Sequence, residues 1–139
     1  MKKVFFFLFL LFVLGCGQAN LPNADLNKLL AFHNDQRVKN NLTPFIMDEY
    51  LNDYAQKHAE WMAKKNTMRH SSMNDLMKNY RTAGENIAWN QKDEETVVDA
   101  WMHSKPHKAN ILNKKFNKIG FGMVRNSRGQ PYWCTNFAD

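Results

Sequence analysis

The apolar residues of this chain recur with a helical period through most of its length and with a strand period near its end. Spacings of three and four residues predict four helices, each behind a capping residue or a helix-starting proline. These helices begin near Asp25, Asp48, Asp93 and Pro106. Asn23 is a second candidate cap for the first helix. Residues 66–81 carry few apolar positions, which predicts a long connection with one helical turn.

Alternation replaces the helical spacing in the C-terminal part. Residues 119–124 and 132–137 alternate in the manner of strands. Residues 126–129 form a hairpin turn between them, in which Gly129 supplies a positive φ. Residues 84–89 are a third strand candidate. Helices followed by an antiparallel sheet indicate the α+β class.

The N-terminus predicts export. Lys2 and Lys3 precede an apolar run over residues 4–14, the layout of a signal peptide, and the run is shorter than the roughly 20 residues of a membrane-spanning helix. Residues 13–16 resemble a bacterial lipobox, so we expect removal of residues 1–15 and acylation of Cys16. A plain secreted protein with a coincidental cysteine is the alternative.

This interpretation divides the chain into a signal peptide (1–15), a lipidated cysteine with its tether (16–22) and one folded domain (23–139). Acyl chains on Cys16 would hold the domain to a bacterial membrane without spanning it. Gly17 stands where an aspartate often signals retention in the inner membrane, so an extracytoplasmic location at the outer membrane or cell surface is expected.

Charge and cysteine content narrow the function. The net charge of +6 falls to +4 when Lys2 and Lys3 are removed, which is too small and too evenly spread to indicate nucleic-acid binding. With Cys16 acylated, Cys134 has no disulfide partner. Its place in a strand predicts a buried, inert thiol rather than a nucleophile.

An ordered series of motifs resembles the CAP superfamily, which is named for cysteine-rich secretory proteins, antigen 5 and pathogenesis-related 1 proteins and is also called the SCP domain. The series comprises residues 33–37, 70–71, 84–88, 101, 107, 110–112, 119–122 and 132–137. Without cysteine pairs, the chain is similar to the compact bacterial branch. The resemblance implies a three-layer α-β-α sandwich with a small antiparallel central sheet and a cleft above it.

The family's cleft is described by two histidines and two acidic residues. Carried over by motif, these positions fall on His70, Glu85, Ser104 and His107. Ser104 departs from the pattern, because an acidic residue is common there, so one carboxylate remains. Asn110 belongs to the same cleft, where its amide can satisfy loop backbone groups.

The cleft residues support a metal site or a structural network. His70 and His107 can ligate a divalent metal, most plausibly zinc, whereas Glu85 is either a third ligand or an acceptor that fixes one histidine's tautomer. The same residues can instead be hydrogen-bonded cross-links. We expect purely structural roles for His58, as a core histidine donating to a carbonyl, and for His33, Asn34 and Arg37, as a network on the first helix.

Two functional classes stay open. The favoured one is a non-enzymatic binding module for a host or envelope molecule, such as a host protein, a sterol or another lipid, that requires no cofactor. Trp61, Trp89 and Tyr80 would supply contact area unless they belong to the core. The alternative is a metal-assisted hydrolase or protease in which Glu85 activates water and His70 or His107 acts as the acid. A domain that serves only as a stable scaffold is a third possibility.

Overall fold

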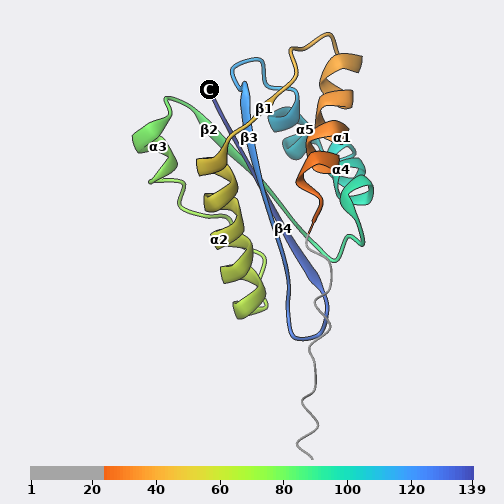
Figure 1. Cartoon of the computed structure of the whole chain (residues 1–139), viewed down its shortest axis with the longest axis vertical. Helices are drawn as coiled ribbons and strands as arrows, with labels where there is room; N and C mark the ends of the chain where they lie inside the picture. Colours follow the sequence, from red (N-terminus) through yellow and green to blue (C-terminus); the bar gives the residue numbers. More distant parts are fainter. Residues whose placement is uncertain (1–23) are drawn as a thin grey trace, which may run out of the picture.

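The computed structural model describes residues 24–139 (Figure 1). Its elements, in chain order, are α1 Leu26–Lys39, β1 Ile46–Met47, α2 Glu49–Lys65, α3 Leu76–Asn79, β2 Ala83–Trp89, α4 Glu94–Met102, α5 Lys105–Ile111, β3 Lys118–Arg125 and β4 Pro131–Ala138. The predictions for residues 1–15, for Cys16 with its tether and for the cap at Asn23 lie outside the described residues. No helix within residues 24–139 is long and apolar enough to cross a membrane.

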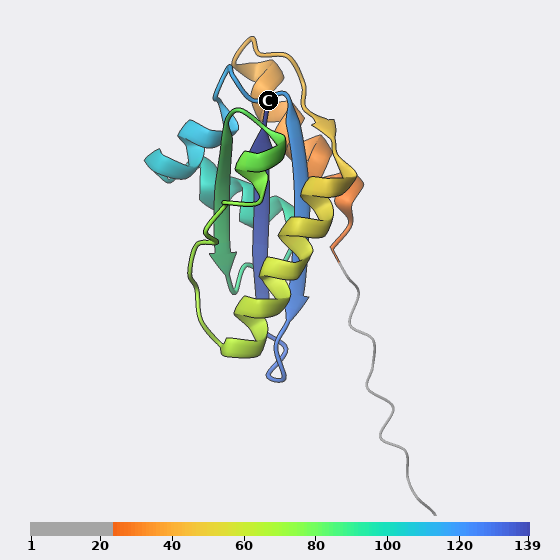
Figure 2. The ribbon, with the colours of Figure 1, turned by 90° about the vertical axis from the view of Figure 1, so that its left-hand side faces the viewer.

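The helices form two layers around one sheet with the strand order β1-β3-β4-β2. Helices α2 and α3 lie on one face of the sheet, and α1, α4 and α5 lie on the other (Figures 1 and 2). The α+β class and the three-layer sandwich are therefore confirmed. Asp25, Asp48 and Asp93 accept hydrogen bonds from backbone amides of the helices they cap, which explains where α1, α2 and α4 begin.

The sheet is mixed rather than purely antiparallel. Strands β2, β4 and β3 pair antiparallel, but β1 pairs in parallel with β3, and Ile46 lies opposite Lys118. The sequence did not predict β1, because a strand of two residues is too short to show alternation. The single turn of α3 within residues 66–81 and the positive φ of Gly129 agree with the sequence predictions.

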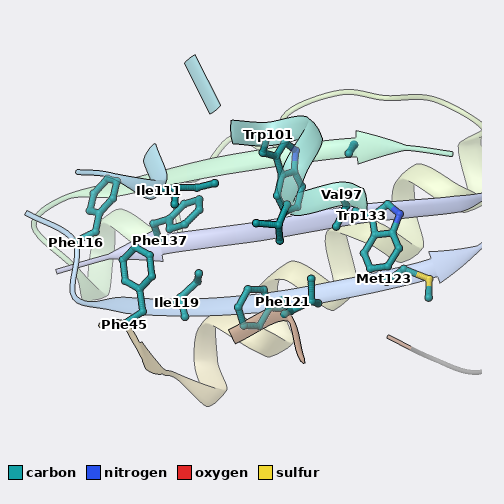
Figure 3. Close-up of a cluster of buried hydrophobic side chains, with 13 residues drawn as sticks. Phe45, Val97, Trp101, Ile111, Phe116, Ile119, Phe121, Met123, Trp133 and Phe137 are labelled. Atoms are coloured by element: carbon teal, nitrogen blue, oxygen red, sulfur yellow. The ribbon is translucent and has the colours of Figure 1, made fainter. Parts of the chain in front are cut away.

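The larger core lies between the sheet and the α1/α4 layer (Figure 3). Trp101, Trp133, Phe121 and Phe137 are almost completely buried there. Arg37 is buried beside this core and donates to four backbone carbonyl oxygens, those of Thr43, Ile111, Asn113 and Phe116, at 2.7–3.0 Å. Asn34 exchanges hydrogen bonds with the backbone of Phe45, so the network expected on the first helix is confirmed.

The α2 layer approaches β3 much more closely. A side-chain carbon added at Gly120 would overlap the backbone of Leu51 and Asn52 in α2. Asn52 also accepts a hydrogen bond from the amide of Phe121, and Gln56 accepts one from the amide of Met123. Helix α2 thus contacts the strand backbone directly and also satisfies its open hydrogen bonds.

We expect Gly120→Ala to lower the free energy of unfolding by about 3 kcal/mol or more, because the new methyl group must displace a helix backbone. Gly129→Ala is the matched control. Gly129 has φ +76°, but a side-chain carbon added there would have no atom within 4 Å. This substitution should therefore cost only about 1 kcal/mol of unfolding free energy. Urea denaturation measures both values, and equal losses would contradict the close approach of α2.

Burial of His33 makes stability depend on pH. Its Nδ1 donates to the Leu29 carbonyl at 2.7 Å, while its Nε2 is buried without a partner in the described part of the chain. Burial lowers the pKa of His33 to about 4, although the bond to Leu29 opposes the shift. The unfolded chain therefore binds more protons between about pH 6.5 and pH 4, and stability decreases as the pH falls through this range.

The loss should total about 3 kcal/mol between pH 6.5 and pH 4. We expect His33→Leu to remove this part of the pH dependence, as measured by urea denaturation at half-unit pH steps. His103→Gln, which alters an exposed histidine on the C-cap of α4, should leave it unchanged. An unaltered slope in His33→Leu would show that other groups produce the acid sensitivity.

Candidate functional site

The predicted cleft residues come from three segments around β2. His70 lies in the connection after α2, and Glu85 lies on β2 on the side of the sheet that faces α2. Ser104 is the N-cap residue of α5, and His107 and Asn110 follow within that helix. The sheet edge at β2 therefore brings residues from both helical layers together.

Glu85 is the buried centre of this arrangement. Its Oε1 accepts hydrogen bonds from His70 Nδ1 at 2.8 Å and from the Ser71 amide at 2.9 Å. Its Oε2 accepts from Asn136 Nδ2 at 3.4 Å and lies 3.7 Å from the Cys134 thiol. The Glu85 side chain is only 1% exposed, against 60% for His70. The histidine therefore covers the carboxylate.

The surroundings of Glu85 favour its ionised form. Burial raises the pKa of Glu85, but hydrogen bonds from Ser71 and His70 and the charge of His58 outweigh this effect and lower the pKa below its usual value. An ionised carboxylate can only accept, so Nδ1 of His70 donates to it, and in the neutral ring Nε2 has the lone pair. Glu85 therefore orients His70.

His107 is held in a similar way on the other side of β2. Its Nδ1 lies 2.8 Å from the Ser104 hydroxyl, which can donate or accept. Burial, followed by the charge of His70, lowers the pKa of His107. Each of the two histidines is thus positioned through Nδ1.

Asn110 connects α5 to the strand. Its Nδ2 donates to the Glu85 carbonyl at 3.2 Å and to Asn86 Oδ1 at 2.8 Å, and Asn86 donates to the His107 carbonyl. The amide thus satisfies a backbone carbonyl of strand β2, whereas the sequence suggested backbone groups of a loop. Gly84 makes room for this contact, because an added side-chain carbon would lie 3.0 Å from Asn110 Oδ1.

The two cleft histidines supply fewer ligands than the three or four of a usual metal site. Within residues 24–139, no group of three or more histidine, cysteine, aspartate or glutamate side chains is placed to hold a metal ion. Glu85 is directed at His70 and Ser71, so it occupies the place of an orienting acceptor rather than that of a third ligand. His70 Nε2 and His107 Nε2 are the two nitrogens left for a ligand.

A groove next to His70 was not predicted from the sequence. Its volume is about 480 Å³, and it is lined by Tyr54, His58, Trp61, Arg69, His70, Ser71 and Ser72. The irregular segment that forms one wall has no periodicity from which its position could be predicted. The spacing of three between His58 and Trp61 on an exposed helix face was the only available signal.

His58 belongs to this groove rather than to the core. Its Nε2 donates to the Arg69 carbonyl at 2.7 Å, and its ring stacks on that of Trp61 with a centroid separation of 5.7 Å. The predicted bond to a carbonyl is present, but the side chain is partly exposed because the groove lies beside it. Trp61 and Trp89 are 39% and 42% exposed, so neither is a core residue.

Cys134 is buried and free, and burial followed by the charge of Glu85 raises the pKa of its thiol. A thiol in that setting is a poor nucleophile. The prediction of an inert cysteine is confirmed.

The motifs and the fold identify the family. The sequence model of the cysteine-rich secretory protein family, CAP, matches residues 30–137. The chain belongs to the CAP family. It is 42% identical over 119 residues to the uncharacterized protein YkwD of Bacillus subtilis (strain 168), in a match that covers 79% of this chain and 45% of YkwD. The CAP domain described here thus spans less than half of that relative.

Solved structures agree with this assignment. An outer surface protein from Borrelia burgdorferi superposes with a TM-score of 0.76 at 22% identity, covering 85% of this chain and 97% of that one. An extracellular protein containing an SCP domain from Bacillus anthracis gives a TM-score of 0.68 at 26% identity, with coverages of 81% and 39%. These likenesses support the CAP fold.

We expect Glu85→Gln to lower the free energy of unfolding by about 1–3 kcal/mol, because the new amide group must face donors that the carboxylate now accepts from. The lowered pKa of Glu85 means that its contribution is present above about pH 4.5 and is lost as the pH falls further. Urea denaturation at pH 7 tests the substitution. Glu60→Gln, on an exposed glutamate bonded to Gln56, should change stability little, and equal effects would contradict the buried role of Glu85.

Proposed function

We propose that this CAP domain is a non-enzymatic binding module, displayed outside the cell and held to a bacterial membrane by acyl chains on Cys16. Its ligand would be a host or envelope molecule, with a sterol or another lipid as the first class to test. The observation that carries the proposal is the groove beside His70, which combines exposed aromatic rings with polar side chains.

The lining of the groove suits an amphipathic ligand. Trp61 and Tyr54 offer ring surface of the kind that packs against a fused-ring or acyl body. Arg69 and Ser72 border the same space and can bind a hydroxyl or an anionic head group. Mixed apolar and polar lining is typical of small-molecule sites.

The buried state of Glu85 supports binding over hydrolysis. Both carboxylate oxygens already face donors within the protein. A general base must reach a water molecule or the substrate. Activation of water by Glu85 would require His70 to move away first.

The metal-assisted hydrolase is the second candidate, and the shared orientation of the two histidines favours it. His70 and His107 would hold zinc through Nε2, and zinc would supply a Lewis acid and an activated water. Glu85 and Ser104 would keep the two rings in place through Nδ1. Two protein ligands without a third predict weak binding.

We expect residues 17–139 to bind cholesterol, presented in a cyclodextrin complex, with a change in tryptophan fluorescence. Trp61→Ala should weaken binding at least about tenfold, equivalent to about 1.4 kcal/mol, because it removes the ring from the groove. Trp89→Ala, which alters an exposed tryptophan outside that groove, should have little effect. Sterol binding that is equal in both variants would place the ligand elsewhere.

Zinc calorimetry on the same protein separates the two candidates. His70→Ala combined with His107→Ala should leave the domain folded but less stable, because Glu85 loses the hydrogen bond from His70. Zinc binding with a micromolar or lower dissociation constant, abolished by that double substitution, would instead favour the hydrolase.

A further inference from the structure

Four basic side chains gather at the end of the domain that carries the β3–β4 hairpin. Lys64 and Lys65 lie in the last turn of α2, Arg125 is the last residue of β3, and Arg128 lies in the hairpin turn. Asn126 donates to Asn66 Oδ1 at 2.7 Å and so ties the hairpin to the C-cap of α2. Both segments lie at the lower end of the molecule in Figure 1. We call these four residues the basic end.

The charges of the basic end are not neutralised by the described part of the chain. None of the four residues forms an ion pair within residues 24–139, whereas Lys39, Lys78 and Arg81 elsewhere are paired with aspartates. Glu60 is the carboxylate that lines the same groove as Lys64 and Arg125. The basic end therefore keeps an excess of positive charge.

Trp89 adds an aromatic side chain to this end. Trp89 is the last residue of β2 and pairs with Tyr132. It lies on the sheet face that α2 covers, and its side chain is 42% exposed. Lys92 and Asp93 follow it as an ion pair, and the acidic residues Glu94 and Glu95 then begin α4, in the helical layer on the opposite face of the sheet from α2 (Figure 1). Exposed tryptophan at the same end of a domain as lysine and arginine is a combination found where proteins meet a membrane interface.

The N-terminal end of α1 points toward the end of the domain that carries the hairpin. Helix α1 begins at Leu26 with its first turn directed toward the same end as the hairpin (Figures 1 and 2). The stretch from Cys16 to Ala24 can span about 28 Å when extended. A lipid on Cys16 would thus be tethered to Ala24 within that length.

We propose that the basic end, with Trp89, docks on the anionic phospholipid surface of the membrane. The inference rests on the proposed anchor at Cys16 for the nearness of that membrane, but the docking chemistry belongs to the folded domain alone. Lysine and arginine bind the phosphate-rich surface by charge. Trp89 enters the interfacial layer with its ring.

Vesicle binding of residues 17–139, which lack the anchor but contain every described core residue, tests the proposal. We expect binding to vesicles of phosphatidylcholine with about 30% phosphatidylglycerol, weakened by about 0.5 M salt, and little binding to phosphatidylcholine alone. Each basic residue should contribute about fivefold. Lys64→Gln, Lys65→Gln and Arg128→Gln together should therefore lower the partition coefficient by about a hundredfold.

The matched control removes the same charge from the opposite end of the sheet. Lys108→Gln, Lys114→Gln and Lys115→Gln alter exposed lysines of α5 and of the loop before β3. Their charges lie beyond the screening distance of about 10 Å from the bound surface, so this variant should bind nearly as well as the parent. Equal losses in the two triple variants, or no preference for anionic vesicles, would overturn the proposal.

Fluorescence gives a readout that does not depend on the basic variants. Lipids brominated in the acyl chain should quench the parent protein, and Trp89→Phe should remove most of that quenching. Unchanged quenching in Trp89→Phe would contradict the proposed orientation. Mass spectrometry of the full chain recovered from bacterial membranes tests acylation of Cys16 separately, so failure of the anchor and failure of the docking surface remain distinguishable.

Discussion

The buried carboxylate of Glu85 is the constraint on which the site depends. An ionised group without solvent must be hydrogen-bonded or the fold loses several kcal/mol. Glu85 meets this requirement by fixing His70 and the Ser71 amide, which come from a segment with little regular structure of its own. The wall of the groove is therefore held in place by its hydrogen bonds to the buried carboxylate of Glu85 rather than by local helical or strand propensity.

Hydrogen bonds also connect β2 to the helical layer on the opposite face of the sheet. Asn110 of α5 donates to Asn86 and to the Glu85 carbonyl of β2, and Asn86 donates to the His107 carbonyl of α5. The Trp101 indole donates to the Ile87 carbonyl. Two helical layers that never touch the same face of the sheet are thus joined around its edge. The polar cleft residues, which suggest catalysis in the sequence, mostly form the hydrogen bonds that connect the two helical layers to β2. One nitrogen of each cleft histidine is left for a ligand.

Much of the fold could be predicted from the sequence because the signals were local. Asp48 caps α2 within one turn, and the 126–129 turn lies between two alternating strands. Strand β1 was missed because its pairing is decided by distant residues. The motifs predicted that His70 and Glu85 belong to one cleft, but motif spacing does not show which of the two side chains covers the other. The groove at Trp61 depends on an aperiodic wall and left almost no trace in the sequence.

Helix α2 has one further consequence. Beyond the two residues of β1, strand β3 would expose unpaired amides, and an open strand edge is a template for joining the sheets of neighbouring molecules. Asn52 and Gln56 occupy the amides of Phe121 and Met123, while side chains from α4 and α5 cover carbonyls of β2. Both margins of the sheet are thereby blocked. Many copies crowded at one surface could then stay individually folded instead of merging into fibres.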